Sequence, residues 1–376
     1  MKKNTEGSVC KSSLFLIVTE RCNLDCTYCT FKKDKRESER IPVMTPDIVE
    51  SGIKVWLGME SLRKNIASRL SVIFYGGEPL LNPAGIFAGL EFIRTLEDTG
   101  RLEGKVLEKR IITNGTLVEG TPREVLRQFK EMRVGVTVSL DGPRWVHDAY
   151  RKSQDEKGSF GRIIKGLTIL KEAGIEVGLS VTLTPLSIMT ISETVALAEK
   201  FDVKGIGVNP LIGQGMRILQ DIPLEKYVKQ AAQASVTCFH KAREVGIRED
   251  RVSDKRDALS GLGSCVDCLV PYGGQLAVWP DGTVGVCQAL KEISIGNVGN
   301  DPPVMSRKRE EIATIWAGNL PMFRGECSEC GSRAICGGGC AFSALTIDGS
   351  LSARDNVLCE YTKKIHQLIV SENAIS

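Results

Sequence analysis

The sequence predicts an α/β protein in which parallel strands, each followed by a helix, form an open partial barrel of the TIM type. Short β-rich apolar runs alternate with amphipathic helical segments over the first part of the chain, as in repeated strand–helix units. Six such units lie within about 200 residues, whereas a complete eightfold barrel needs roughly 250 residues. We therefore expect a six-unit partial barrel over residues 1–245 and a small cysteine-rich domain over residues 246–376.

Six runs have the composition of parallel strands that are covered on their outer face. In chain order they are Leu14–Val18, Val72–Tyr75, Arg110–Thr113, Gly135–Leu140, Val177–Leu183 and Gly205–Pro210. Right-handed crossovers place the C-terminal ends of such strands on one rim, where barrels of this type carry their active sites. The residues that directly follow these runs are therefore candidates for a functional site.

Three of the intervening helices have recognisable starts, because a capping side chain precedes a proline there. These starts are Thr45-Pro46, Asn82-Pro83 and Thr121-Pro122. The helix after Asn82 is expected to end near Gly100 and to place on one face Ile86, Phe87, Leu90, Ile93 and Leu96. The next helix is expected to repeat this arrangement with Val125, Leu126, Phe129 and Met132.

A β-hairpin is predicted at the start of the cysteine-rich domain. Leu276–Trp279 and Thr283–Val286 have strand composition, and Pro280-Asp281-Gly282 between them contains the residue types that favour a tight turn. The second strand of this hairpin leads directly into Cys287.

Composition and charge narrow the class of protein. A formal charge of +3 with no long basic run gives no electrostatic argument for binding nucleic acid. Thirteen cysteines and only three histidines favour sulfur-ligated iron over zinc. No window approaches the roughly 20 apolar residues of a membrane helix, and no secretion signal opens the chain. We therefore expect a cytoplasmic protein that does not bind a membrane and that is active only where iron–sulfur clusters survive oxygen.

Cys22, Cys26 and Cys29 follow a C-x3-C-x2-C spacing after the first predicted strand. Three thiolates are one fewer than hold structural zinc or an electron-transfer cluster, so a [4Fe–4S] cluster bound here keeps one iron open. The motif, with Tyr28 before the last cysteine, resembles that of the radical S-adenosylmethionine (SAM) enzymes. The resemblance implies that the open iron binds SAM and that one electron splits SAM to a 5′-deoxyadenosyl radical. A zinc knuckle is the alternative.

Further motifs on the predicted rim also resemble those of radical SAM enzymes. They are Gly76-Gly77-Glu78-Pro79, Thr113-Asn114-Gly115, and Ser139-Leu140-Asp141-Gly142-Pro143 with Arg151 following. Adjacent glycines let the backbone approach a ligand closely, and a glutamate offers a carboxylate to a cationic group. Each motif alone is also typical of an ordinary strand-to-helix turn. The resemblance implies that SAM is contacted by Tyr28, Gly76, Gly77, Glu78, Asn114, Ser139 and Arg151.

Three residues near these motifs have structural interpretations. Asp141 precedes Gly-Pro, where an aspartate usually organises a turn. A lone histidine is more often structural than catalytic, so His147 is expected to be structural. Tyr28 is expected to act through its backbone and ring, near the adenine of SAM, and not through its hydroxyl.

Eight cysteines form a second constellation in the C-terminal part of the chain. Their spacing resembles that of the SPASM domain of radical SAM enzymes, which implies two auxiliary [4Fe–4S] clusters and three clusters in all. By this resemblance the first auxiliary cluster is held by Cys265, Cys268, Cys287 and Cys340, and the second by Cys327, Cys330, Cys336 and Cys359. Two zinc ribbons are the alternative. Cys238 is expected to be a small buried hydrophobe, and Cys10 has no assignment.

The resemblance implies an oxidoreductase that matures a peptide or protein substrate and takes electrons from a flavodoxin- or ferredoxin-type donor. The expected product is a thioether or carbon–carbon crosslink, or another dehydrogenation. Only 21 residues precede Cys22, so a leader peptide would be recognised by the barrel, the SPASM surface or a separate protein.

Two alternative reactions stay open. In the similar anaerobic sulfatase maturases, an aspartate follows the hairpin cysteine and is the expected proton acceptor; here that position is Gln288. An amide cannot act as a general base, which argues against formylglycine formation unless Asp281 or Asp267 substitutes. The second alternative is dehydrogenation of a small-molecule alcohol with the same clusters.

Overall fold

The computed structural model describes residues 11–31, 42–63, 67, 69–102, 105–263 and 265–373, so Cys10 lies outside the described residues. The described strands form one sheet in the order β10-β9-β8-β1-β2-β3-β4-β5-β6-β7. Their bounds are β1 Lys11–Thr19, β2 Arg69–Gly76, β3 Val106–Thr113, β4 Gly135–Ser139, β5 Val177–Leu183, β6 Gly205–Pro210, β7 Arg248–Glu249, β8 Gln275–Val278, β9 Thr283–Gly285 and β10 Ser294–Asn297. The predicted α/β fold is confirmed.

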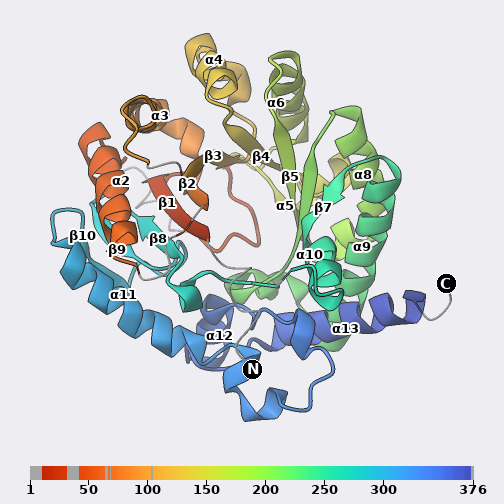
Figure 1. Ribbon diagram of the computed structural model, residues 1–376. Coiled ribbons are helices and arrows are strands. Elements are labelled where there is room, and N and C mark those ends of the chain that lie inside the picture. The colour runs from red at the N-terminus through yellow and green to blue at the C-terminus, as the bar shows by residue number, and fades with distance from the viewer. Residues whose placement is uncertain are drawn as a thin grey trace.

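Neighbouring strands from β1 to β7 are parallel, and helices cover the outside of the curved sheet (Figure 1). The α-helices are α2 Pro46–Ser61, α3 Pro83–Asp98, α4 Arg123–Glu131, α5 Arg144–Tyr150, α6 Phe160–Glu172, α7 Pro185–Met189, α8 Ile191–Lys200, α9 Leu224–Glu244, α10 Asp250–Leu259, α11 Pro302–Ala317, α12 Ala341–Asp348 and α13 Asn356–Asn373. None of the described helices is both long and apolar enough to cross a membrane.

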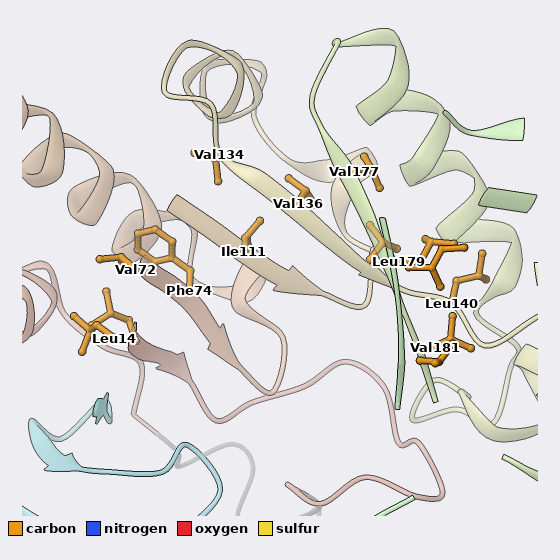
Figure 2. Close-up of a cluster of buried hydrophobic side chains, with 14 of the residues drawn as sticks. Leu14, Val72, Phe74, Ile111, Val134, Val136, Leu140, Val177, Leu179 and Val181 are labelled. Carbon is orange, nitrogen blue, oxygen red and sulfur yellow. The ribbon is translucent and has the colours of Figure 1, made fainter. Parts of the chain in front are cut away.

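The hydrophobic core lies between the sheet and the surrounding helices. Buried and half-buried residues alternate along β2 and β5, as expected for strands with one fully covered face. Figure 2 shows buried side chains of successive strands, among them Phe74, Ile111 and Leu179. Phe74 packs against Gly89 of α3 so closely that a Cβ there would lie 2.7 Å from the ring. The other face of each strand looks into the interior of the open barrel, which we call the lumen.

Two details of the predicted helices are wrong. Phe87 is 44% exposed, because it lies at the edge of the buried face of α3. The helix predicted to start at Thr121-Pro122 begins at Arg123, with Pro122 at the N-cap and no side-chain cap. The Thr121 hydroxyl instead donates a hydrogen bond to the carbonyl of Leu117, 3.1 Å away.

The predicted hairpin is present as β8 and β9, which are antiparallel, and it joins the barrel sheet. β8 pairs in parallel with β1, from Ser13 opposite Gln275 to Leu16 opposite Val278. β10 then extends the sheet by pairing with β9. The hydrogen-bonded ladder therefore continues across the domain division predicted at residue 245.

Helix α11 is tied to α2 by a buried cluster of charges. Arg309 Nη1 lies 2.9 Å from Glu60 Oε1, and both side chains are almost fully buried. Arg63 Nη1 lies 2.7 Å from the second oxygen of the same carboxylate. This ion pair fixes the C-terminal part of the chain against the barrel.

Replacing Glu60 with alanine should lower the free energy of unfolding by about 3–5 kcal/mol, because Arg309 would stay buried without a counter-charge. Denaturant unfolding of the anaerobic protein measures the change. Glu50→Ala on the same helix is the control, since its ion pair with Lys54 is exposed and should contribute less than about 1 kcal/mol. Equal losses from the two variants would contradict this role for Glu60.

Candidate functional site

The loop that carries Cys22, Cys26 and Cys29 follows β1 and lies at the C-terminal ends of the strands. Backbone hydrogen bonds hold it against the end of α5: Asp25 N–H donates to the carbonyl of Lys152 (2.8 Å), and Thr27 N–H to that of Tyr150 (3.0 Å). The loop is therefore held at two places: β1 leads into it, and the segment at the end of α5 binds its backbone.

The three thiols of this loop lie close enough to influence one another. Burial raises the pKa of Cys22 to about 12 and that of Cys26 to about 11, and the charges of neighbouring cysteines raise both further. Three thiolates therefore stay together here only beside a cationic partner, a charge that iron supplies. The described His, Cys, Asp and Glu side chains form no group of three or more that fits a single metal ion. An iron–sulfur cluster fits thiolates that lie farther apart than the ligands of a single ion, because each thiolate binds a different iron atom.

The adjacent glycines after β2 are required by the cysteine loop itself. A Cβ on Gly76, which has a φ of +139°, would lie 2.0 Å from the carbonyl oxygen of Thr19. A Cβ on Gly77 would lie 2.2 Å from that of Arg21. The N–H groups of Gly77 and Glu78 donate to these same two carbonyls at 3.0 and 2.8 Å. The sequence predicts that these glycines let a ligand come close, but in the structure the backbone of the cysteine loop occupies this space.

Glu78 connects the ends of β2 and β3. Its buried carboxylate accepts hydrogen bonds from the hydroxyl of Thr113 (2.6 Å) and from the N–H groups of Asn114 (2.7 Å) and Leu80 (3.0 Å). Burial raises the pKa of Glu78 to about 7, although these hydrogen bonds oppose the shift. The carboxylate therefore fixes the rim, and its contact with a cationic ligand stays a prediction.

Asn114 joins the end of β3 to the cysteine loop. Its side-chain nitrogen donates to Asn23 Oδ1 at 2.9 Å and lies 3.9 Å from the sulfur of Cys22. Asn23 in turn donates to the hydroxyl of Thr116 at 2.8 Å. Of the other predicted SAM contacts, Ser139 is the last residue of β4 and is half-buried.

A buried ion pair lies beside the loop. Asp141 Oδ2 accepts from Arg151 Nε at 2.7 Å, and Asp141 Oδ1 accepts from the N–H of Thr182 at 2.9 Å. The hydroxyl of Tyr28 also donates to Asp141, and the Arg151 guanidinium lies 5.3 Å from the centre of the Tyr28 ring. Burial alone would raise the pKa of Asp141, but the charge of Arg151 holds it below its ordinary value. The Tyr28 hydroxyl thus has a role that the sequence did not indicate.

His147 is linked by hydrogen bonds to both members of this ion pair, directly to Asp141 and through Ser159 to Arg151. Its Nδ1 accepts from the N–H of Asp141 at 3.3 Å, and its Nε2 lies 2.9 Å from the hydroxyl of Ser159. That hydroxyl donates to the carbonyl of Arg151 at 2.6 Å. Burial lowers the pKa of His147 to about 4, so the ring is neutral at physiological pH. These contacts agree with the structural role expected for this histidine.

Three of the four cysteines predicted for the first auxiliary cluster lie together. Burial raises the pKa of Cys287 to about 11, and the charges of Cys287 and Cys340 add to the effect of burial on Cys268. Cys265 has different neighbours: its sulfur lies 3.4 Å from Lys255 Nζ. The structure therefore brings Cys268, Cys287 and Cys340 together and places Cys265 beside a lysine.

Three of the four cysteines predicted for the second auxiliary cluster line a surface cavity of about 470 Å³. Cys327, Cys330 and Cys359 line it, together with Arg354, Lys363 and His366 among others. Cys336 lies within electrostatic reach of Cys359. Three of the four predicted ligands are thus neighbours at the protein surface.

The two aspartates that could substitute for the missing proton acceptor, Asp281 and Asp267, both form ion pairs. Gln288 Oε1 accepts a hydrogen bond from Gln275 Nε2 at 2.9 Å. Asp281, at the hairpin turn, pairs with Lys291 at 2.8 Å. Asp267 is buried between the cations of Arg251 and Lys255, which hold its pKa below the ordinary value against the effect of burial. Both carboxylates are thus held by cationic side chains in this structure.

Tyr75 is a lumen residue that sequence reasoning did not identify. It precedes the glycine pair, and its half-buried side chain packs with a small cluster that includes Trp279. The charges of Cys29 and Cys287 both act on its hydroxyl. The alternating pattern of β2 could have placed it on the lumen face, but nothing in the sequence indicates which centres it lies beside.

Comparison with known proteins identifies the N-terminal part of the chain. Residues 16–201 match the family model of the Radical SAM superfamily. A serine-type anaerobic sulfatase-maturating enzyme of Bacteroides thetaiotaomicron is 30% identical over 41% of this chain and 35% of its own length. The radical SAM cyclopropyl synthase TigE of Paramaledivibacter caminithermalis is 26% identical over 96% of this chain and 74% of its own. A cysteine-type anaerobic sulfatase-maturating enzyme of Clostridium novyi is 23% identical over 96% of both chains.

Solved structures share the fold. Native anSMEcpe with bound AdoMet has a TM-score of 0.73 and 19% identity, covering 96% of this chain and 97% of its own. Streptococcus suis SuiB bound to precursor peptide SuiA has a TM-score of 0.62 and 17% identity, covering 93% of this chain and 76% of its own. The family match and the cysteine loop at the barrel rim lead to one conclusion: residues 16–201 form a domain of the radical SAM superfamily, whose members bind a [4Fe–4S] cluster and SAM.

Proposed function

We propose that the protein is a radical SAM enzyme that oxidatively modifies a peptide and that it carries two auxiliary clusters beside the SAM-binding one. The observation that supports this most is the pairing of β1 with β8, because the cysteine loop follows β1 and Cys287 follows the β8–β9 hairpin. A SAM-cleaving centre and an auxiliary centre would then face the same lumen. When bound, the first cluster and SAM supply a 5′-deoxyadenosyl radical that abstracts a hydrogen atom from the substrate.

The protein's own residues would hold the cofactors as follows. Cys22, Cys26 and Cys29 bind the first cluster, while Gly77 and Glu78 fix the loop through its backbone. SAM would lie over this loop, against the residues carried over from the family: Tyr28, Gly76, Gly77, Glu78, Asn114, Ser139 and Arg151.

The two auxiliary sites differ in their surroundings. At the first site, the proximity of Cys268, Cys287 and Cys340 supports all three as ligands. Cys265 would be the fourth ligand once its contact with Lys255 is broken. The second site, with Cys327, Cys330, Cys336 and Cys359, opens at the surface cavity. A cluster there would be accessible to a flavodoxin- or ferredoxin-type carrier.

A peptide substrate is supported by the structural neighbours. Native anSMEcpe has been solved with the Cp18Cys peptide, and Streptococcus suis SuiB with its precursor peptide. Both share the barrel and the C-terminal arrangement of this chain. Because Gln288 cannot accept a proton and both Asp281 and Asp267 are held in ion pairs, we place crosslinking or another dehydrogenation ahead of formylglycine formation.

The proposal predicts hydrogen abstraction from a peptide without formylglycine formation. Anaerobically reconstituted enzyme with SAM and a reductant is given a pool of synthetic peptides with deuterated side chains, including a sulfatase-type sequence. Deuterium should appear in 5′-deoxyadenosine, and a peptide should lose about two hydrogens, since abstraction is followed by loss of one electron and one proton. The sulfatase-type peptide should not be converted, because an amide at Gln288 cannot accept a proton.

Mass spectrometry of the peptides and of 5′-deoxyadenosine separates the outcomes. Formylglycine formation at a rate comparable to SAM cleavage would restore the sulfatase-maturase alternative. SAM cleavage with no deuterium from any peptide, together with turnover of a deuterated sugar alcohol, would move the protein to the small-molecule class.

A further inference from the structure

Tyr75 is held rigidly at the end of β2, immediately before the glycine pair. Its ring makes edge-to-face contacts with Phe15 of β1 at 5.9 Å and with Phe31 of the cysteine loop at 5.6 Å between ring centres. It also packs against the cluster formed by Ile17, Ala277 and Trp279 of β1, β8 and the hairpin turn. Aromatic contacts of this kind fix a ring without using its polar group.

The ring of Tyr75 lies between the two segments that carry predicted metal ligands: it contacts Phe31, two residues after Cys29, and it packs against the cluster with Trp279 of the hairpin that leads to Cys287. Burial raises the pKa of Tyr75 to about 12, and the charges of Cys29 and Cys287 contribute to this shift. A substrate carbon that reacts first with the radical and then gives up an electron has to lie within reach of both centres. The position of Tyr75 is therefore where a substrate segment would pass.

This hydroxyl has no hydrogen-bond partner among the described residues, and because the side chain is only half-buried, a ligand could reach it. The other tyrosines near the barrel interior differ. Tyr28 donates to Asp141, and Tyr227 lies between the N–H of Leu211 and the carbonyl of Leu183. A fixed phenol with a free donor, facing a lumen, is typical of a ligand contact.

We propose that the Tyr75 hydroxyl donates a hydrogen bond to a backbone carbonyl of the peptide in the lumen and so holds the reacting residue between the cysteine loop and Cys287. The inference rests on the proposed peptide-modifying function. A phenol stays protonated near neutral pH, so it donates to an oxygen acceptor, and a peptide carbonyl is the acceptor that such a substrate always presents. Tyr75 is thus a substrate-binding residue of the proposed reaction.

The test is Tyr75→Phe, which removes one oxygen and keeps the aromatic contacts. We expect 5′-deoxyadenosine formation without peptide and bound iron to stay within about twofold of the wild type. Deuterium transferred from the accepted peptide of the synthetic pool, per 5′-deoxyadenosine formed, should fall about 5- to 10-fold, as the loss of one hydrogen bond at the reacting segment predicts. Tyr361→Phe is the control, because it also removes one phenolic oxygen, but that oxygen lies 2.6 Å from the Ser235 hydroxyl of α9, so the variant should keep the wild-type ratio.

Three results would overturn the inference. Tyr75→Phe with an unchanged transfer ratio would show that the hydroxyl does not hold the substrate. Loss of iron or of peptide-independent SAM cleavage in this variant would place Tyr75 at the cofactor instead. No deuterium transfer from any peptide by the wild-type enzyme would contradict the proposed function itself, and the inference with it.

Discussion

A protein in which Cys22, Cys26 and Cys29 are all replaced by alanine should cleave no SAM and yet keep roughly eight iron atoms, two thirds of the wild-type content. The three thiols occupy one loop held by β1, α5 and the glycine pair, whereas the proposed auxiliary ligands come from other segments of the chain. Their loss should therefore leave the two auxiliary sites intact. Iron analysis and 5′-deoxyadenosine assays on anaerobically reconstituted protein measure both quantities.

Cys238 provides the matched control for this variant. It is fully buried in α9 and belongs to neither predicted cluster constellation. Cys238→Ala should keep the full iron content and the full rate of SAM cleavage. Formation of 5′-deoxyadenosine by the triple variant would exclude this loop as the site of SAM cleavage.

Replacing Asp141 with alanine should lower the free energy of unfolding by about 3–5 kcal/mol, because Arg151 would stay buried without its counter-charge. The same change frees the Tyr28 hydroxyl and the N–H of Thr182. Because Arg151 and Tyr28 are both predicted SAM contacts, SAM binding should weaken as well. Anaerobic denaturant unfolding and equilibrium dialysis with SAM measure the two effects.

Asp155→Ala is the control for this variant. Asp155 pairs with Lys157 at the surface, where solvent screens the charges, so the loss of this ion pair should change stability little. If the two alanine variants were equally stable and bound SAM equally well, the buried ion pair would have no role in ordering the site.

The strands of the barrel could be predicted because each is an apolar run bounded by turn residues, and all six predicted runs are strands in the structure. The pairing of β8 with β1 could not be predicted. Local hydrophobicity shows that Leu276–Trp279 is a strand, but it does not show which distant edge the strand joins. β7 was missed because two residues carry too short a pattern.

At the site, too, the sequence motifs could be predicted, but the contacts between residues far apart in the chain could not. Cysteine spacing and the glycine pair are local patterns, so the loop at the rim was foreseen. The partners were not: the glycines face the backbone of Thr19 and Arg21, and Asp141 receives hydrogen bonds from Tyr28 and Arg151. An aspartate before Gly-Pro has the composition of a turn, so nothing in the sequence marks it as the buried partner of an arginine.

The parallel pairing of Ser13 with Gln275 has a consequence for how the chain is made. At ribosomal rates of about 5–20 residues per second, β1 leaves the ribosome roughly 13–50 s before β8 does. During that interval one side of β1 has no strand beside it, and unpaired strand edges promote aggregation. Synthesis that stops before residue 275 leaves this edge open permanently. Co-translational folding of the protein is therefore completed only when its C-terminal third has emerged.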